Sequence, residues 1–226
     1  MKNKLLKVKL NYISKFRCKG VIGMVNRSRK KNLIFVIGII VLAIIGIIIF
    51  KSVYKNDNYK NEGINMTEED KEIINKVIEL TEEKIGLQYV WGGKGEIMTE
   101  ERLDELTSYY GDEYYPLSRE TYIGSQAFDC SGLTYWAYRE VTGVEIGYST
   151  FDQEDILQEY EVSKEDLQPG DLIYTPGHVV LYKGKGKIIN AYNKYIYPIG
   201  GVKEGSLNLG NDSVIYRPLD YINSLK

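Results

Sequence analysis

The chain has 226 residues, enough for one domain with flanking segments or for two small domains. Its 29 basic residues nearly balance its 31 acidic ones, but eleven of the basic and none of the acidic residues lie in 1–50, which leaves a net charge of −13 for residues 51–226. An acidic body argues against nucleic acid as a partner, because binding phosphates requires a basic face. One histidine and two cysteines exclude most zinc sites and a disulfide-rich scaffold. We expect no metal and no cofactor.

Residues 33–50 form an unbroken run of eighteen apolar or glycine residues. As a helix rising about 1.5 Å per residue, the run would cover roughly 27 Å, close to the hydrocarbon core of a membrane. It therefore predicts a transmembrane helix. The alternatives are a buried soluble helix and a cleaved signal peptide, but a long basic segment precedes the run and no small-x-small cleavage site follows it.

The basic residues before this run predict the orientation of the chain. Residues 1–32 are expected to form a cytoplasmic tail, because positively charged flanks stay on the cytoplasmic side. Residues 51–66 are rich in Lys, Asn and Asp and predict a tether of up to roughly 50 Å. The domain expected over 67–226 would then lie outside the cell, held to the cell membrane by a single span.

The domain is expected to begin with a helix. Thr67 caps it, acidic residues occupy its first turn, and Gly86 stops it. A short β-like segment follows at 89–93. The polar, tyrosine-rich residues 94–127 then predict an excursion between two core pieces, with a short helix over 99–110.

The second half of the domain changes from a helical to a strand pattern. Apolar residues at helical spacing follow residue 127, and Gly143 ends that helix. Strands are expected over four later segments, at 171–174, 178–182, 187–192 and 213–217. Helices followed by an antiparallel sheet predict an α+β fold.

Cys130 is the only cysteine of the expected extracellular part, so it has no disulfide partner there. It lies in the first turn of the helix after residue 127, where the helix N-terminus stabilises an anion. Such positions lower the pKa of cysteine thiols to about 3.5–7.5. The position favours a nucleophile over the alternative, a buried structural cysteine. Cys18, in the expected cytoplasmic tail, is interpreted as an idle thiol.

His178 is the only histidine of the chain, so any Cys–His chemistry must use it. If the following turn has an odd number of residues and is centred on Gly184, His178 lies opposite Asn190 across the hairpin. The Asn190 amide oxygen would then accept the imidazole N–H and fix the ring. A two-residue turn would direct Asn190 to the other face. Without this pairing, His178 is a surface residue at a turn and Asn190 is a polar strand residue.

Five motifs occur in order along the chain: Tyr89-Val90-Trp91-Gly92-Gly93, Asp129-Cys130-Ser131-Gly132-Leu133, Pro169-Gly170-Asp171-Leu172, Gly177-His178-Val179 and Ile189-Asn190-Ala191. Together they resemble the NlpC family of cell-wall cysteine peptidases, which have a papain-like fold. The resemblance spans residues 72–220. It implies that Cys130 is the nucleophile, His178 the base and Asn190 the third polar residue, where many members have a second histidine.

The resemblance also implies roles for three neighbours of the nucleophile. Tyr89 is expected beside the thiol, and Asp129 and Ser131 are expected to shape the pocket for the amine side of the substrate. The excursion 94–127 is longer than in the simplest members. Its tyrosines either stack on substrate or pack inside the protein; they are Tyr109, Tyr110, Tyr114, Tyr115 and Tyr122.

The implied substrate is a peptidoglycan stem peptide, cut after γ-D-glutamate by a membrane-anchored cysteine endopeptidase. Two alternatives use the same region of the chain. One is a papain-like wall amidase or acyltransferase with the same three residues, and the other is a non-catalytic wall-binding module. A hydrolase tethered in this way also fits service to a secretion or conjugation apparatus, and the sequence does not choose between that role and general wall remodelling.

Overall fold

The computed structural model describes residues 66–194 and 196–226. The expected cytoplasmic tail, the transmembrane run 33–50 and all but the last residue of the tether lie outside this part of the chain and stay predictions. Among the described residues, no helix is both long and apolar enough to cross a membrane.

The first described helix, α2 (Glu68–Glu82), begins as expected at Thr67. The Thr67 hydroxyl accepts the Asp70 N–H at 3.1 Å and the Asp70 carboxylate accepts the Thr67 N–H at 3.2 Å, so the two residues cap the helix reciprocally. The helix ends four residues before Gly86, because a turn of irregular backbone intervenes.

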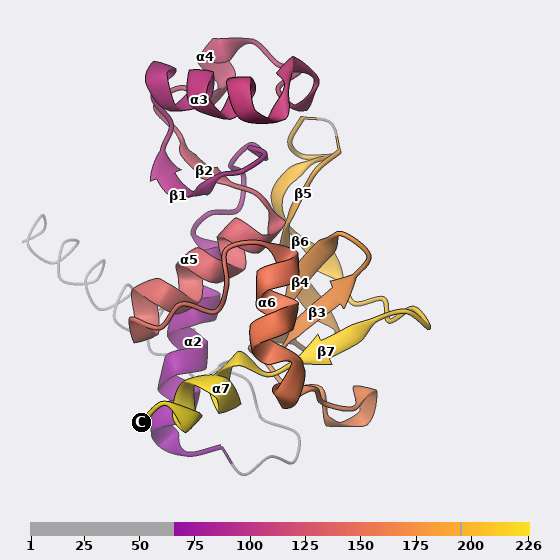
Figure 1. The fold of residues 1–226 in the computed structure, drawn as a ribbon. Coiled ribbons are helices and arrows are strands. Elements are labelled where there is room, and N and C mark those ends of the chain that lie inside the picture. The colour runs from indigo at the N-terminus through magenta and orange to yellow at the C-terminus, as the bar shows by residue number, and fades with distance from the viewer. Residues whose placement is uncertain (1–65, 195) are drawn as a thin grey trace, which may run out of the picture. The chain divides into compact units, whose positions relative to one another are not determined.

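The excursion expected over 94–127 is a folded unit at one end of the domain, above the sheet in Figure 1. It consists of β1 (Lys94–Ile97), α3 (Glu100–Tyr110), a 3₁₀ helix (Asp112–Tyr114), α4 (Arg119–Tyr122) and β2 (Gln126–Phe128). The strands β1 and β2 pair antiparallel and close the excursion at its base. The expected helix is confirmed as α3, whose N-cap is Thr99.

Two helices follow the excursion. The first, α5 (Cys130–Thr142), ends at Gly143 in the left-handed conformation, as the sequence predicts. The second, α6 (Thr150–Leu157), was not expected from the sequence; it continues into a 3₁₀ helix (Gln158–Tyr160), and another 3₁₀ helix (Lys164–Asp166) leads to the sheet. Buried Gln153 ties α6 to the start of α5, because its amide nitrogen donates to the Ser131 carbonyl at 3.0 Å.

A five-stranded antiparallel sheet, ordered β6-β5-β4-β3-β7, forms the second half of the domain. Its strands are β3 (Leu172–Thr175), β4 (His178–Gly184), β5 (Lys187–Tyr192), β6 (Gly201–Ser206) and β7 (Val214–Tyr216), and α7 (Pro218–Ser224) follows. The α+β fold and the four expected strands are confirmed. β6 was missed because Lys, Glu, Gly and Ser in its sequence lack the apolar alternation of a half-buried strand.

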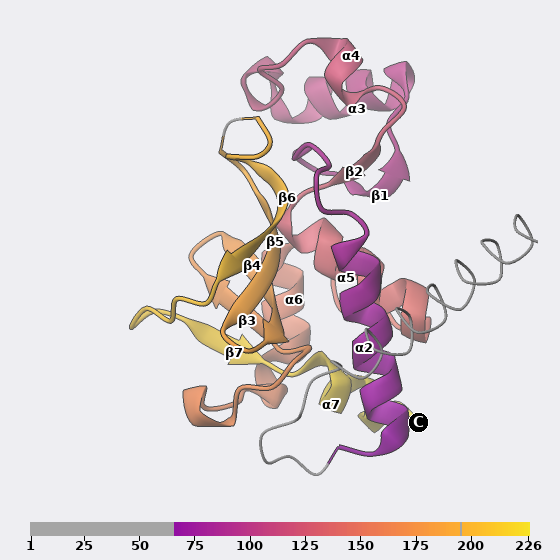
Figure 2. The same cartoon turned by 180° about the vertical axis from the view of Figure 1, so that it is seen from behind.

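The buried side chains form two clusters. The larger lies between the sheet and the helices: α5 lies against one face of β4 and β5, and α2 packs on α5 (Figures 1 and 2). The smaller belongs to the excursion and contains Leu103, Leu106 and Tyr122. Each part of the domain therefore has apolar burial of its own to stabilise it.

Candidate active site

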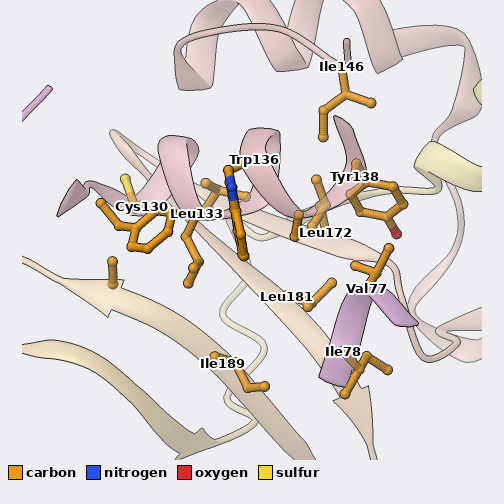
Figure 3. Close-up of a cluster of buried hydrophobic side chains, with 14 of the residues drawn as sticks. Val77, Ile78, Cys130, Leu133, Trp136, Tyr138, Ile146, Leu172, Leu181 and Ile189 are labelled. Carbon is orange, nitrogen blue, oxygen red and sulfur yellow. The ribbon is translucent and has the colours of Figure 1, made fainter. Parts of the chain in front are cut away.

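Cys130 is the first residue of α5 and lies at the end of the larger buried cluster (Figure 3). The residue before it, Asp129, is the N-cap, and its carboxylate accepts the Gly132 N–H at 2.6 Å. This cap fixes the first turn of the helix. The Cys130 side chain is 8% exposed, so the thiol is largely enclosed by its neighbours.

The segment 89–93 packs directly against this first turn. The Gly93 carbonyl accepts the Asp129 N–H at 3.0 Å, and the Gly92 N–H donates to the Asp129 carboxylate at 3.1 Å. A Cβ atom on Gly132 would overlap the Gly93 carbonyl oxygen, so glycine is required where the two segments touch. Two motifs far apart in the sequence are thus joined into one site.

Tyr89 lies at the same place and is 7% exposed. Its phenol oxygen faces the backbone N–H of Cys130, a hydrogen-bonding contact that opposes the effect of burial on the phenol. Burial nevertheless raises the pKa of Tyr89 well above its ordinary value, so the hydroxyl keeps its proton at neutral pH. The Cys130 N–H therefore points toward the phenol oxygen, and the Tyr89 O–H is a second donor beside it.

The Cys130 thiol differs from the expectation of a lowered pKa. Burial raises the pKa of the thiol, and the Asp129 carboxylate raises it further. Three groups lower the thiol pKa without reversing the shift: the N–H groups of Val179 and Ser131, and the Lys94 ammonium. The expectation from the helix N-terminus was wrong, because it left out the desolvation of the sulfur and the carboxylate beside it.

His178 begins β4, after a turn at Pro176 and Gly177. The contact between Cys130 and the Val179 N–H brings the thiol to the backbone directly after this histidine. Burial lowers the pKa of the His178 imidazole, and the Asn190 side chain raises it by a smaller amount. The imidazole is therefore neutral at neutral pH and has a nitrogen free to accept a proton.

The β4–β5 hairpin brings Asn190 to His178 by a route different from the expected one. Leu181 pairs with Ile189, and this register places Asn190 across from the second residue after His178 rather than directly opposite it. The turn has two central residues, Lys185 and Gly186, both at positive φ. The expected odd-numbered turn was wrong, but a bulge before the turn inserts one extra residue in β4 and returns Asn190 to the His178 face.

Asn190 is 5% exposed, and its amide oxygen makes no hydrogen bond of standard geometry among the described residues. The interaction that raises the His178 pKa is therefore looser than a well-formed hydrogen bond. The fold therefore places Asn190 near His178, but the two side chains do not form a hydrogen bond of standard geometry.

An open groove of about 350 Å³ lies beside these two residues. Its lining comes from β3, β4, β5 and β6 and from the segment after β6, and includes His178, Asn190, Val180, Ile188 and Lys203. The β-branched side chains give it an apolar floor. The groove therefore opens directly next to the imidazole.

Lys94 is a residue of the site that the sequence reasoning missed. Its ammonium lies 2.7 and 2.8 Å from the two oxygens of Asp129 and 3.0 Å from the Ser131 hydroxyl. Of the three residues predicted beside the nucleophile, Asp129 and Ser131 are therefore bound to a cation of the chain itself. The signal available was a lysine directly after the motif that ends in Gly92 and Gly93.

The excursion tyrosines divide into two groups. Tyr115 and Tyr122 are buried and pack in the smaller cluster. Tyr109, Tyr110 and Tyr114 are exposed and join Trp91 in a set of ring contacts with centroid separations of 4.7–6.4 Å. The first group packs inside the excursion, whereas the second packs on itself and on Trp91 at the surface.

The site combines a thiol, a neutral imidazole and two neighbouring hydrogen-bond donors, which are the groups needed for attack on a carbonyl. Among residues 66–194 and 196–226, no cluster of three or more His, Cys, Asp or Glu residues is arranged to hold a metal ion.

Comparison with known families identifies this arrangement. A model of the NlpC/P60 family matches residues 86–202, more than half of the chain. The chain belongs to the NlpC/P60 family. The resemblance inferred from the five motifs is confirmed, and the matched range includes all six residues predicted for the NlpC/P60 site.

Curated relatives with similar segments are named as endopeptidases. A probable endopeptidase of Corynebacterium glutamicum is 44% identical over 73 residues, 31% of this chain and 34% of that protein. The peptidoglycan DL-endopeptidase CwlO of Bacillus licheniformis is 34% identical over 73 residues, 30% of this chain and 16% of that protein. The chain thus spans about a third or less of the length of these curated relatives.

Two solved structures are similar to this chain. The P60 domain of an antigen from M. avium subspecies paratuberculosis has a TM-score of 0.47 and 24% identity, covering 66% of this chain and 96% of that one. The peptidoglycan hydrolase RipB of Mycobacterium tuberculosis has a TM-score of 0.47 and 22% identity, covering 74% of this chain and 77% of that one.

Proposed function

We propose that this NlpC/P60 protein is a peptidoglycan hydrolase, a cysteine endopeptidase that cuts stem peptides after γ-D-glutamate. The observation that carries the proposal is the contact between Cys130, at the start of α5, and the start of β4, where His178 lies. The family and its curated relatives, which are named endopeptidases, support the same reaction. The cleavage position follows from the resemblance of the motifs and is the finer part of the proposal.

The proposed reaction begins from a neutral thiol and a neutral imidazole. His178 accepts the Cys130 proton as the sulfur attacks the peptide carbonyl, and the developing oxyanion lies against the Cys130 N–H and the Tyr89 hydroxyl. His178 then gives the proton to the leaving amine, and an acyl-enzyme remains. Water, deprotonated by His178, hydrolyses the thioester and restores the thiol. Asn190 orients the imidazole throughout.

The proposal also includes the location of the enzyme. The apolar run 33–50 would anchor the chain in the cell membrane, with the catalytic domain on the outer side facing the wall. Removing residues 1–50 is expected to move the protein from the membrane fraction to the soluble fraction without changing the chemistry of the site. Fractionation of cells that express both forms tests this expectation.

The activity is tested by digesting purified muropeptides with the full chain and identifying the products by mass spectrometry. We expect a product that ends in γ-D-glutamate and its complementary peptide, with no detectable turnover for Cys130→Ala. Cys18→Ala is the matched control, because it removes the other thiol of the chain, and it is expected to keep full activity.

Three outcomes would contradict the proposal in different ways. No cleavage by the intact chain would leave wall binding as the function. Products cut at another bond would indicate an amidase, and transfer of the acyl group to an added amine would indicate an acyltransferase. Undiminished cleavage by Cys130→Ala would remove Cys130 from the mechanism.

A further inference from the structure

Lys203 lines the groove that opens next to the His178 imidazole. Among the described residues of this lining, it is the only one with a full charge, because His178 is neutral at neutral pH and the other lining residues are apolar or uncharged. No carboxylate belongs to the described lining. The groove therefore has positive character and favours an anionic group.

The sheet holds Lys203 close to both predicted residues of the groove. Asn190 of β5 pairs directly with Lys203 of β6, and residues paired in this way point to the same face with Cβ atoms about 4.5–5.5 Å apart. Tyr192 provides a second connection. Its ring centroid lies 4.5 Å from the Lys203 ammonium and 6.1 Å from the centroid of the His178 ring. The ammonium and the imidazole thus flank the same tyrosine.

The charge of Lys203 is not neutralised within the described part of the chain. Its ammonium donates to the Ile199 carbonyl, which is an uncharged acceptor. The adjacent carboxylate of Glu204 pairs instead with Lys183 at 2.8 Å and with Lys187 at 3.3 Å. An ammonium has three donors, so Lys203 keeps two for a ligand.

The charge of the whole domain limits which anion can bind there. Residues 51–226 have a net charge of −13, which repels a polymer that carries many negative charges. A single carboxylate beside one ammonium meets no such barrier. The proposed substrate offers carboxylates of this kind, because a γ-linked D-glutamate keeps its α-carboxyl outside the peptide chain and the leaving peptide ends in a carboxyl group.

We propose that Lys203 is a specificity-determining residue whose ammonium binds a free carboxylate of the stem peptide in the groove beside His178. Amidation of that carboxylate then weakens binding, because a neutral amide loses the charge attraction and the charge-assisted hydrogen bonds. This inference rests on the proposed endopeptidase function.

The first test compares three peptides of identical sequence. One has both carboxylates free, one is amidated at the α-carboxyl of D-glutamate, and one is amidated at the end of the leaving peptide. For one of the amidated peptides, kcat/KM of the full-length wild type is expected to fall about tenfold, mainly through a higher KM, because hydrogen bonds to charged groups contribute roughly this factor to binding. The position that causes the loss identifies the carboxylate that Lys203 binds.

Variants of Lys203 assign this preference to its ammonium. Lys203→Met should bring the ratio of kcat/KM for the free and amidated peptides close to one, and Lys203→Arg should keep the wild-type preference, since it keeps the charge. Lys187→Met is the matched control, because Lys187 is an exposed lysine of β5 outside the groove lining, and it should leave the ratio unchanged. Equal kcat/KM for all three peptides, or a preference that persists in Lys203→Met, would overturn the inference.

The second test measures binding without cleavage. Titration calorimetry of the full-length Cys130→Ala variant should show about tenfold tighter binding of the free-acid peptide than of the amidated one. Adding Lys203→Met to this variant should remove the difference. Equal affinities for the free and amidated peptides, or no binding of either, would count against the inference.

The two tests separate failure of this inference from failure of the proposed function. If the wild type cleaves none of the peptides, the endopeptidase proposal fails, and the calorimetric comparison still decides whether Lys203 binds a carboxylate. If Lys203→Met does not fold, salt decides. The wild-type preference for the free acid should shrink several-fold at about 1 M salt, where the screening length is about 3 Å, and an undiminished preference would contradict an ion pair.

Discussion

Cys130 and His178 show how burial decides the resting state of a thiol–imidazole pair. Burial raises the pKa of the thiol and lowers that of the imidazole, so both shifts favour the uncharged pair over thiolate and imidazolium. The helix N-terminus and the Val179 N–H favour the anion but act against a larger desolvation. In the proposed reaction the thiolate therefore forms during attack rather than beforehand.

The pH dependence of activity follows from these directions. We expect kcat/KM to rise with pH as His178 loses its proton, with a midpoint below the ordinary imidazole value of about 6.5. It should fall only above the ordinary thiol value of about 8.5, because the thiol keeps its proton to a higher pH. A pH profile of kcat/KM measures both limbs. Rapid alkylation of Cys130 at mildly acidic pH would instead indicate a stored ion pair.

Tyr89 provides a test of the two convergent donors. Tyr89→Phe removes the hydroxyl but keeps the buried ring, so the fold should be unchanged. We expect kcat to fall by about 10²–10³ with little change in KM, as for the loss of one oxyanion donor. Tyr160→Phe is the control, since its hydroxyl bonds to Ser224 of α7 at 2.8 Å and not to a residue of the site. An equal loss in both variants would argue against the assignment.

At the scale of elements, the sequence predicts those whose signal is local. α2, α3, α5 and four strands have caps, stops or apolar periodicity that can be read from the chain. The β4–β5 register could not be read in this way. The turn has an even number of residues, and a bulge in β4 just before it restores the pairing of an odd-numbered turn. The Lys94–Asp129 pair was hidden for another reason: it joins residues 35 positions apart through the pairing of β1 and β2.

The contact between segment 89–93 and α5 predicts the effect of adding one methyl group. Gly132→Ala would place a Cβ against the backbone oxygen of Gly93, which cannot move without disturbing the Asp129 cap. We expect a loss of about 1–3 kcal/mol in the free energy of unfolding and a lower kcat. Urea denaturation measures the stability. Glu140→Ala, exposed on the same helix, should change it by less than about 0.5 kcal/mol.

At the scale of the described domain, the two hydrophobic clusters divide the sources of stability. The larger cluster holds the sheet to α2 and α5, and the smaller holds the excursion together. Regions with their own buried contacts open separately when their local stability is lower than that of the whole. The excursion is therefore expected to respond to mutation as a unit.

Leu103→Ala tests this division. Leu103 is 1% exposed in the smaller cluster, and its truncation should cost about 2–5 kcal/mol locally. Hydrogen exchange should become faster over residues 98–127 while the sheet keeps its protection. Leu157→Ala, in the larger cluster, should instead speed exchange throughout the domain. Uniform acceleration by both variants would show a single cooperative unit.

Trp91 packs against both clusters, and its ring lies 6.4 Å from Tyr89 and 4.7 Å from Tyr114. The indole therefore packs between the excursion and Tyr89, the residue that faces the Cys130 amide. If the excursion were replaced by a different insertion, the new segment would need an aromatic side chain for the indole to pack against. Without such a side chain, Tyr89 would lose the packing that Trp91 provides, even though no site residue had been altered.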